Sequence, residues 1–265
     1  MKKSIKGDHH SGKRGIYILP NLLTSASLFG GFYAIISSIQ GNFEAAAKAI
    51  ILSAICDGLD GRVARFTGTT SDFGTEYDSL SDLVSFGVAP AVLSYLWALK
   101  PFGRLGWLAA FMFAICGALR LARFNIEKTK IKSTFFKGLP IPIAACFIAS
   151  IILFTGSFPD FAERRDVIII VMIYGLSFLM VSSLDYPSFK EFHIKRQKPF
   201  SVLVASILVL LMILYKPKIL LFIIFLTYIC SGPVITIFRY YKKHIITGTY
   251  PEMSEENNEN KTVKN

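Results

Sequence analysis

The sequence is poor in the side chains that build disulfide-bonded domains and zinc sites. It has four cysteines and four histidines among 265 residues. The cysteines stand singly in apolar runs, at positions 56, 116, 146 and 230, and none has the spacing of a metal-ligand pair. A disulfide framework is therefore not indicated, and the cysteines are interpreted as small apolar side chains.

Charge is also scarce, because 18% of the residues are charged whereas 52% are hydrophobic. The mean hydropathy is +0.49, and a helix needs about 20 apolar residues to cross a hydrocarbon core. These values predict an all-α, polytopic membrane protein with about eight transmembrane helices. The apolar runs are Leu22 to Ile39, Phe43 to Cys56, Leu83 to Leu99, Leu105 to Phe124, Leu139 to Phe158, Val167 to Leu184, Phe200 to Leu214 and Ile219 to Phe238. No Ala-x-Ala cleavage pattern follows the first run, so it is interpreted as a retained span.

Basic residues predict the orientation, because cytoplasmic loops carry the excess of Lys and Arg. With the N-terminus inside, 22 of the 29 basic residues fall on the cytoplasmic side. The net charge of +11 is spread over five juxtamembrane segments, which favours contact with anionic lipid over nucleic-acid binding. We expect three parts: a basic segment at 1–20, a transmembrane catalytic domain at 21–245 and a disordered polar tail at 246–265. The transmembrane domain would lie in the cytoplasmic membrane, with both termini of the chain on the cytoplasmic side.

One stretch, from Cys56 to Asp82, carries five aspartates between two apolar runs, and four of them form two pairs at helical spacing. At about 100° per residue, Asp57 and Asp60 share one helical face, and Asp78 and Asp82 share another. The connection between the two helices is short, so we expect the helices to be antiparallel neighbours. Their four carboxylates would then converge at the cytoplasmic edge of the membrane, between the second and third helices.

Such a cluster needs a counter-ion, because two unit charges about 4 Å apart repel by about 4 kcal/mol at an effective dielectric of 20. Oxygen ligands without His or Cys suit hard ions such as Mg²⁺, Mn²⁺ or Ca²⁺. Four carboxylates could neutralise two divalent ions, an arrangement that handles phosphate. On geometry alone an ion-transport site stays open as an alternative.

The stretch reads as D-x-x-D-G-x-x-A-R, eight residues, then G-x-x-x-D-x-x-x-D. It resembles the signature of the CDP-alcohol phosphotransferase family at eight fixed positions over 26 residues. The resemblance implies transfer of a substituted phosphate from a CDP-linked donor to an alcohol, with release of CMP. It also implies two divalent metal ions, Mg²⁺ or Mn²⁺, and a homodimer.

The resemblance implies a role for each matching residue. Metal ligands would be Asp57, Asp60, Asp78 and Asp82, and Asp82 would also be the catalytic base. Residues near the CDP moiety would be Gly61, Ala64, Arg65 and Gly74 of the signature, with Asn21 and Thr24 of the N-terminal element "PNLLT".

Three further segments resemble the membrane-integral phosphatidylserine synthases: "ALRLARFN" at 118–125, "GLPIPIAA" at 138–145 and "YPSFK" at 186–190. They imply CDP-diacylglycerol as donor and L-serine as acceptor. Arg120 and Arg123 are candidates for binding the acceptor or its phosphate, because serine brings a carboxylate. The alternatives are glycerol 3-phosphate or inositol phosphate as acceptor, an ether-lipid donor, and, more remotely, a divalent-cation transporter.

A His-x-Lys motif at His193 to Lys195 is typical of an unrelated, phospholipase-D-type synthase. That chemistry needs two such motifs, and this sequence has one without the accompanying Asp. His193 is therefore interpreted as a loop residue.

Overall fold

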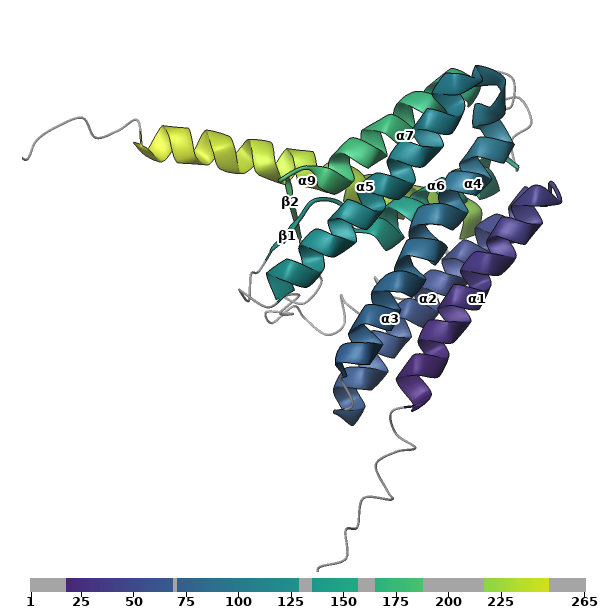
Figure 1. Cartoon of the computed structure of the whole chain (residues 1–265). Helices are drawn as coiled ribbons and strands as arrows, with labels where there is room; N and C mark the ends of the chain where they lie inside the picture. Colours follow the sequence, from purple (N-terminus) through teal and green to yellow (C-terminus); the bar gives the residue numbers. More distant parts are fainter. Residues whose placement is uncertain (1–17, 69–70, 129–134, 157–164, 188–216, 248–265) are drawn as a thin grey trace, which may run out of the picture.

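The computed structural model describes residues 18–68, 71–128, 135–156, 165–187 and 217–247 (Figure 1). Helices make up nearly all of this part, and seven of the eight predicted apolar runs coincide with helices. The remaining predicted run, Phe200 to Leu214, lies outside the described residues, as do His193, most of the N-terminal segment and most of the polar tail.

The first two helices and the start of the third form a bundle at one end of the molecule. They are α1 (Ile18–Ile39), α2 (Phe43–Thr67) and α3 (Asp72–Asp82). Helix α2 ends at Gly68, whose φ of 64° is left-handed and favours glycine. Helix α3 begins at Ser71, whose side chain accepts a hydrogen bond of 3.0 Å from the Gly74 amide. The prediction that both helices extend through the aspartate stretch is confirmed.

Helix α3 continues as one rod to Phe102 without a break in the helical backbone. The rod comprises η1 (Leu83–Val88), α4 (Ala89–Ser94), η2 (Tyr95–Leu99) and η3 (Lys100–Phe102). Segments η1 and η2 are π-helical. A π-turn adds one residue to a helical turn and is often found near functional sites.

Helix α1 packs against both α2 and the rod through small residues. A Cβ atom added to Gly30 would collide with the Ser53 side chain, and one added to Gly31 would lie 2.6 Å from Ser85 Cα. The hydroxyls of Ser53 and Ser85 each donate a hydrogen bond of 3.0 Å to the carbonyl oxygen of Ser27. Close backbone approach and interhelical hydrogen bonds of this kind hold membrane helices together.

The remaining helices are α5 (Arg104–Lys128), α6 (Ile141–Thr155), α7 (Arg165–Val181) and α9 (Pro217–Thr247). Helix α6 is buried along most of its length and packs against α2 and α9, while α5 packs against α7. Figure 1 shows α9 lying across the other helices, with its C-terminal half projecting from them. An ion pair of 3.0 Å between Lys218 and Glu44 joins the start of α9 to the start of α2.

The prediction of a helical protein is confirmed for the described residues, which add one small antiparallel sheet to the helices. Its strands are β1 (Phe135–Lys137) and β2 (Asp185–Pro187), with Phe136 paired to Tyr186. Tyr186 is fully buried, and a Cβ atom on Gly232 of α9 would collide with its ring. The sheet therefore joins the segment before α6 to the segment after α7, and its β2 strand packs against α9 through Tyr186.

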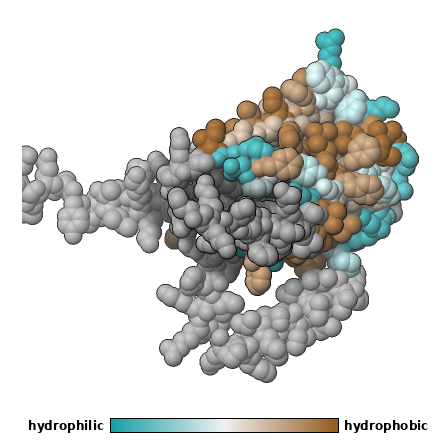
Figure 2. Space-filling view, turned by 60° about the horizontal axis from the view of Figure 1, so that its bottom comes forward, coloured by the Kyte–Doolittle hydropathy of each residue, from teal (hydrophilic) through white to brown (hydrophobic). Residues whose placement is uncertain are grey.

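Four helical stretches are long and apolar enough to cross a membrane: Pro20–Ile39, Asp72–Phe102, Arg104–Ile126 and Pro217–Phe238. Helices α6 and α7 are apolar but shorter, and α2 carries the charged aspartate stretch. Large apolar side chains such as Phe29, Phe32 and Phe111 are exposed, and Figure 2 shows apolar patches interrupted by polar ones on one face. The described residues have the helices of a membrane protein, whereas the number of eight spans stays a prediction.

The close approach of Gly31 to Ser85 gives a test of the bundle. We expect Gly31→Ala to lower the free energy of unfolding by about 1–3 kcal/mol, because the added methyl meets backbone that cannot move aside. Gly175→Ala is the matched control, since Gly175 is exposed on α7 and a Cβ there meets nothing within 4 Å. Thermal unfolding in detergent measures both variants, and equal melting temperatures for Gly31→Ala and the parent would contradict the expectation.

Candidate active site

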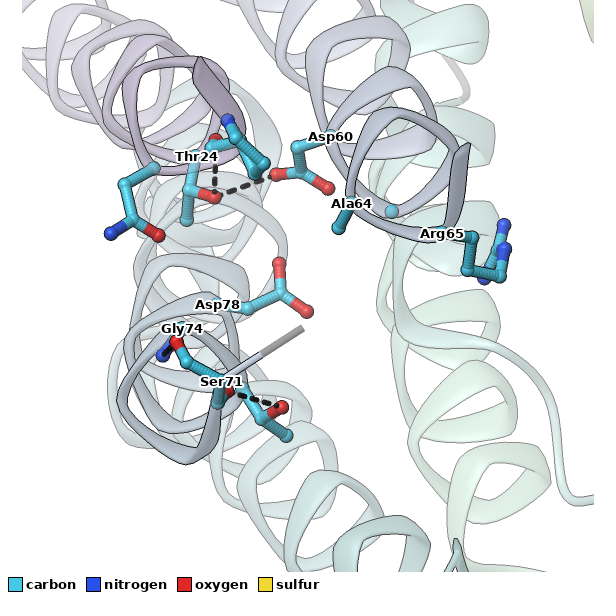
Figure 3. Close-up of a pocket in the computed structure, with 11 residues that line it drawn as sticks. Thr24, Asp60, Ala64, Arg65, Ser71, Gly74 and Asp78 are labelled. Carbon is cyan, nitrogen blue, oxygen red and sulfur yellow. Dashed lines mark hydrogen bonds between the residues drawn. The ribbon is translucent and has the colours of Figure 1, made fainter. Parts of the chain in front are cut away.

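A pocket lies between the N-terminal parts of α1 and α3 and the C-terminal part of α2 (Figure 3). Three helices and the residue that caps α3 supply its walls. The lining residues are Pro20, Asn21, Thr24, Asp60, Gly61, Ala64, Arg65, Ser71, Gly74, Thr75 and Asp78. All six residues predicted to lie near the CDP moiety are among them.

Three of the four predicted aspartates form one group. Asp57, Asp60 and Asp78 each offer a carboxylate oxygen, and these oxygens lie within 4.8 Å of one another. Asp60 is buried, and its Oδ2 accepts a hydrogen bond of 2.9 Å from the hydroxyl of Thr24. Figure 3 shows Asp60 of α2 and Asp78 of α3 projecting into the same space, with Thr24 of α1 beside Asp60.

Asp82 lies next to this group. Its carboxyl lies close enough to those of Asp57, Asp78 and Asp60 to interact with their charges. All four predicted aspartates are therefore neighbours where α2 faces α3.

The group fits a hard divalent cation. Two carboxylates at 4.8 Å repel by roughly 3.5 kcal/mol at an effective dielectric of 20, so a cation between them is favoured. Carboxylate oxygens are the ligands that Mg²⁺ and Mn²⁺ prefer. Asp57, Asp60 and Asp78 could hold such an ion.

Two glycines leave the pocket walls open. A Cβ atom at Gly61 would meet nothing closer than the Arg65 guanidinium, 3.9 Å away. One at Gly74 would lie 3.1 Å from Ser71 Oγ and 3.4 Å from Asn21 Oδ1, and would therefore fill the space between them. Arg65 lines the pocket, but Figure 3 shows its side chain extending away from Asp78.

The two arginines predicted to bind the acceptor are not among the residues that line this pocket. Arg120 is buried, and its guanidinium lies 5.8 Å from the centre of the Phe124 ring. Arg123 donates hydrogen bonds to three backbone carbonyls: Val181 at 3.1 Å, Ser182 at 3.3 Å and Lys137. In this structure Arg123 ties the end of α5 to the end of α7 and to β1, and its contact with an acceptor stays a prediction.

Three residues of the pocket were not predicted: Pro20, Ser71 and Thr75. Pro20 is the first residue of the "PNLLT" element and directly precedes Asn21, so the sequence could have indicated that it lies near the pocket. Ser71 is a helix N-cap, which a serine before an acidic first turn indicates. Thr75 carries no such signal.

Comparison with known proteins decides the family. A family model for CDP-alcohol phosphatidyltransferase matches residues 17–182, which span α1 to the end of α7. The chain belongs to the CDP-alcohol phosphatidyltransferase family. The family predicted from the aspartate motif is thereby confirmed, and the motif residues of the pocket lie inside the matched range.

Several relatives in this family have assigned names. The CDP-diacylglycerol–serine O-phosphatidyltransferase of Helicobacter pylori is 41% identical over 176 residues, which cover 66% of this chain and 74% of the relative. The enzyme of the same name from Bacillus subtilis is 38% identical over 173 residues, covering 65% and 92%. The archaetidylserine synthase of Methanothermobacter thermautotrophicus is 42% identical over 171 residues, covering 64% and 69%.

The position of Arg123 predicts a structural effect. We expect Arg123→Lys to lower the free energy of unfolding by about 1.5–3 kcal/mol, because an ammonium group cannot reproduce the planar fork that reaches three carbonyls. The exposed Arg62 on α2 supplies the control Arg62→Lys. Thermal unfolding measures both variants, and we expect a lower melting temperature for Arg123→Lys alone. An unchanged melting temperature together with a raised KM for the acceptor would instead favour the predicted contact of Arg123 with substrate.

Proposed function

We propose that this chain is a CDP-diacylglycerol–serine O-phosphatidyltransferase, which forms phosphatidylserine and CMP. The observation that carries the proposal is the convergence of Asp57, Asp60 and Asp78 at a pocket lined by Asp60 and Asp78, in a member of the CDP-alcohol phosphatidyltransferase family. The names of the bacterial relatives support serine as the acceptor. The archaeal relative supports the same acceptor class and leaves an ether-lipid donor as the alternative.

In this proposal Asp57, Asp60 and Asp78 hold two divalent metal ions, Mg²⁺ or Mn²⁺, with Asp82 as a further ligand. Bound there, the ions would neutralise charge on the donor's diphosphate and on the departing CMP. The hydrogen bond from Thr24 orients Asp60, which is buried and so has few alternative conformations.

Asp82 is the proposed base. The serine hydroxyl oxygen attacks the phosphorus that bears the lipid, the bond from that phosphorus to the CMP oxygen breaks, and the hydroxyl proton passes to Asp82. Its position beside Asp57, Asp60 and Asp78 supports this role, because it places a carboxylate next to the proposed metal site. The transfer is in-line and direct, without a phosphatidyl-enzyme intermediate.

The rest of the pocket would hold the substrates. Gly61 and Gly74 leave room for CDP between α2 and α3, with Asn21, Ala64 and Arg65 beside it. Arg120 and Arg123 remain the proposed acceptor-binding residues. A glycerol 3-phosphate or inositol phosphate acceptor would need more cations around the pocket than Arg65, which is the one basic residue among the described residues that line it.

The proposed setting is the cytoplasmic membrane, with the pocket on the cytoplasmic side and CDP-diacylglycerol entering from lipid. The excess of basic residues on that side supports the orientation. The family resemblance supports a homodimer.

A CMP-release assay tests the reaction and the acceptor together. The purified chain receives CDP-diacylglycerol and Mn²⁺, with L-serine, glycerol 3-phosphate or inositol phosphate offered separately. We expect release with serine alone and a loss of about 10²–10⁴-fold in Asp82→Asn, the usual contribution of a general base. Release with another acceptor would refute serine specificity, and no release with any acceptor would refute the proposed donor.

Metal binding tests the aspartates without turnover. We expect Asp78→Asn to weaken Mn²⁺ binding at least tenfold, because it removes a charged ligand. Asp72→Asn is the matched control, since Asp72 is exposed on the same helix and is not among the residues that line the pocket. Loss of the free Mn²⁺ signal in electron paramagnetic resonance measures both variants, and equal affinities would contradict the assignment.

A further inference from the structure

One side-chain hydrogen bond joins α5 to the aspartate helix. Asn125, near the end of α5, donates from Nδ2 to the hydroxyl oxygen of Ser79 on α3 at 2.9 Å. Ser79 Oγ donates in turn to the carbonyl of Thr75, one turn back, at 3.0 Å. Ser79 follows Asp78 directly in the chain, so the bond reaches α3 at the level of the aspartate group.

Among the described residues, two further side-chain hydrogen bonds join α3 to α1. Ser81 donates to the carbonyl of Thr24 at 3.1 Å. The hydroxyls of Tyr77 and Ser25 lie 2.9 Å apart. Helix α1 therefore holds α3 on one side, and Asn125 holds it on another.

The positions of these tethers around α3 bracket the aspartates. With Tyr77 as the reference and about 100° per residue, Ser81 lies at about 40° and Ser79 at about 200°. Asp78 lies at about 100° and Asp82 at about 140°, between the two sets of tethers. A rotation of α3 about its axis that would turn the aspartates away from α2 must break the tether to α1 or the one to α5.

The hydrogen bonding of Asn125 also indicates that its amide serves to hold α3 in position. Its Oδ1 is buried and has no hydrogen-bond partner among the described residues. Leaving a buried acceptor unsatisfied costs stability, so an amide at this place is a poor choice for packing alone. The bond from Nδ2 to Ser79 is what the amide supplies that an apolar side chain of the same size would not.

The end of α5, which carries Asn125, is itself held in place. Two residues before Asn125, the guanidinium of Arg123 binds the carbonyls of Val181, Ser182 and Lys137. The last turns of α5 are thereby held to α7 and to β1. Asn125 thus connects α3 to the end of α5, which Arg123 in turn holds to α7 and β1.

We propose that Asn125 is a positioning residue for the metal site: through Ser79 it sets the rotation of α3 and so aims Asp78 and Asp82 at α2. This inference rests on the proposed function, because it takes these aspartates to be metal ligands. Asn125 itself needs no contact with metal or substrate in this role.

Mn²⁺ binding by the purified full-length chain, measured by electron paramagnetic resonance without substrate, tests the inference. We expect Asn125→Ala and Ser79→Ala each to weaken Mn²⁺ binding about tenfold, the effect typical of groups that orient metal ligands. The double variant should bind no more weakly than either single variant, because both changes remove the same bond. Ser79→Thr keeps the hydroxyl and should bind as the parent does.

Ser94→Ala controls for the loss of a buried serine in the same rod, because among the described residues Ser94 bonds to Pro90 and Ala91 of its own helix. It should leave the Mn²⁺ affinity unchanged. Parental Mn²⁺ affinity in Asn125→Ala would overturn the inference, and a raised KM for serine in that variant would then assign Asn125 to substrate contact. Absence of Mn²⁺ binding by the parent chain would instead remove the proposed metal site, and this inference with it.

Discussion

Repulsion between carboxylates is the constraint on which the rest of this structure depends. Asp57, Asp60 and Asp78 place oxygens within 4.8 Å of one another, on two helices that face each other across a pocket. Without support, such helices would rotate or separate until the charges were apart. Helix α1 opposes this by packing against both: Thr24 bonds to Asp60 of α2, and its backbone carbonyl accepts from Ser81 of α3. Thr24 of α1 is therefore bonded to both helices that carry the aspartates.

The end of α5 completes this support. Within six residues, Arg120 packs on Phe124 in the interior, Arg123 binds the ends of α7 and β1, and Asn125 binds α3. A segment that resembles the phosphatidylserine synthases in sequence thus serves as the junction of several elements. A polar motif at a helix end can specify how helices assemble as well as what they bind.

The aspartate site could be predicted because its signals are local. Charge at helical spacing, a glycine after α2 and a serine before α3 are all readable within one short stretch. The β1–β2 sheet could not be predicted, because three-residue strands have no periodicity and exist only through pairing across about 50 residues. Nor does a sequence distinguish the guanidinium of Arg123, which binds backbone carbonyls here, from one that binds a substrate. Asn125 and Ser79 lie 46 residues apart, and nothing in either residue points to the other.

The ion pair between Glu44 and Lys218 has a consequence for biosynthesis. These residues are 174 positions apart, so at roughly 5–20 residues per second the ribosome needs about 10–35 s to supply Lys218. Until then Glu44 has its ion pair with Lys48. The ring of Tyr186 likewise waits for Gly232 of α9 before it is covered. The three pocket-forming helices are thus made early, whereas the contacts of α9 with the start of α2, with α6 and with β2 form only when the end of the chain has been synthesised.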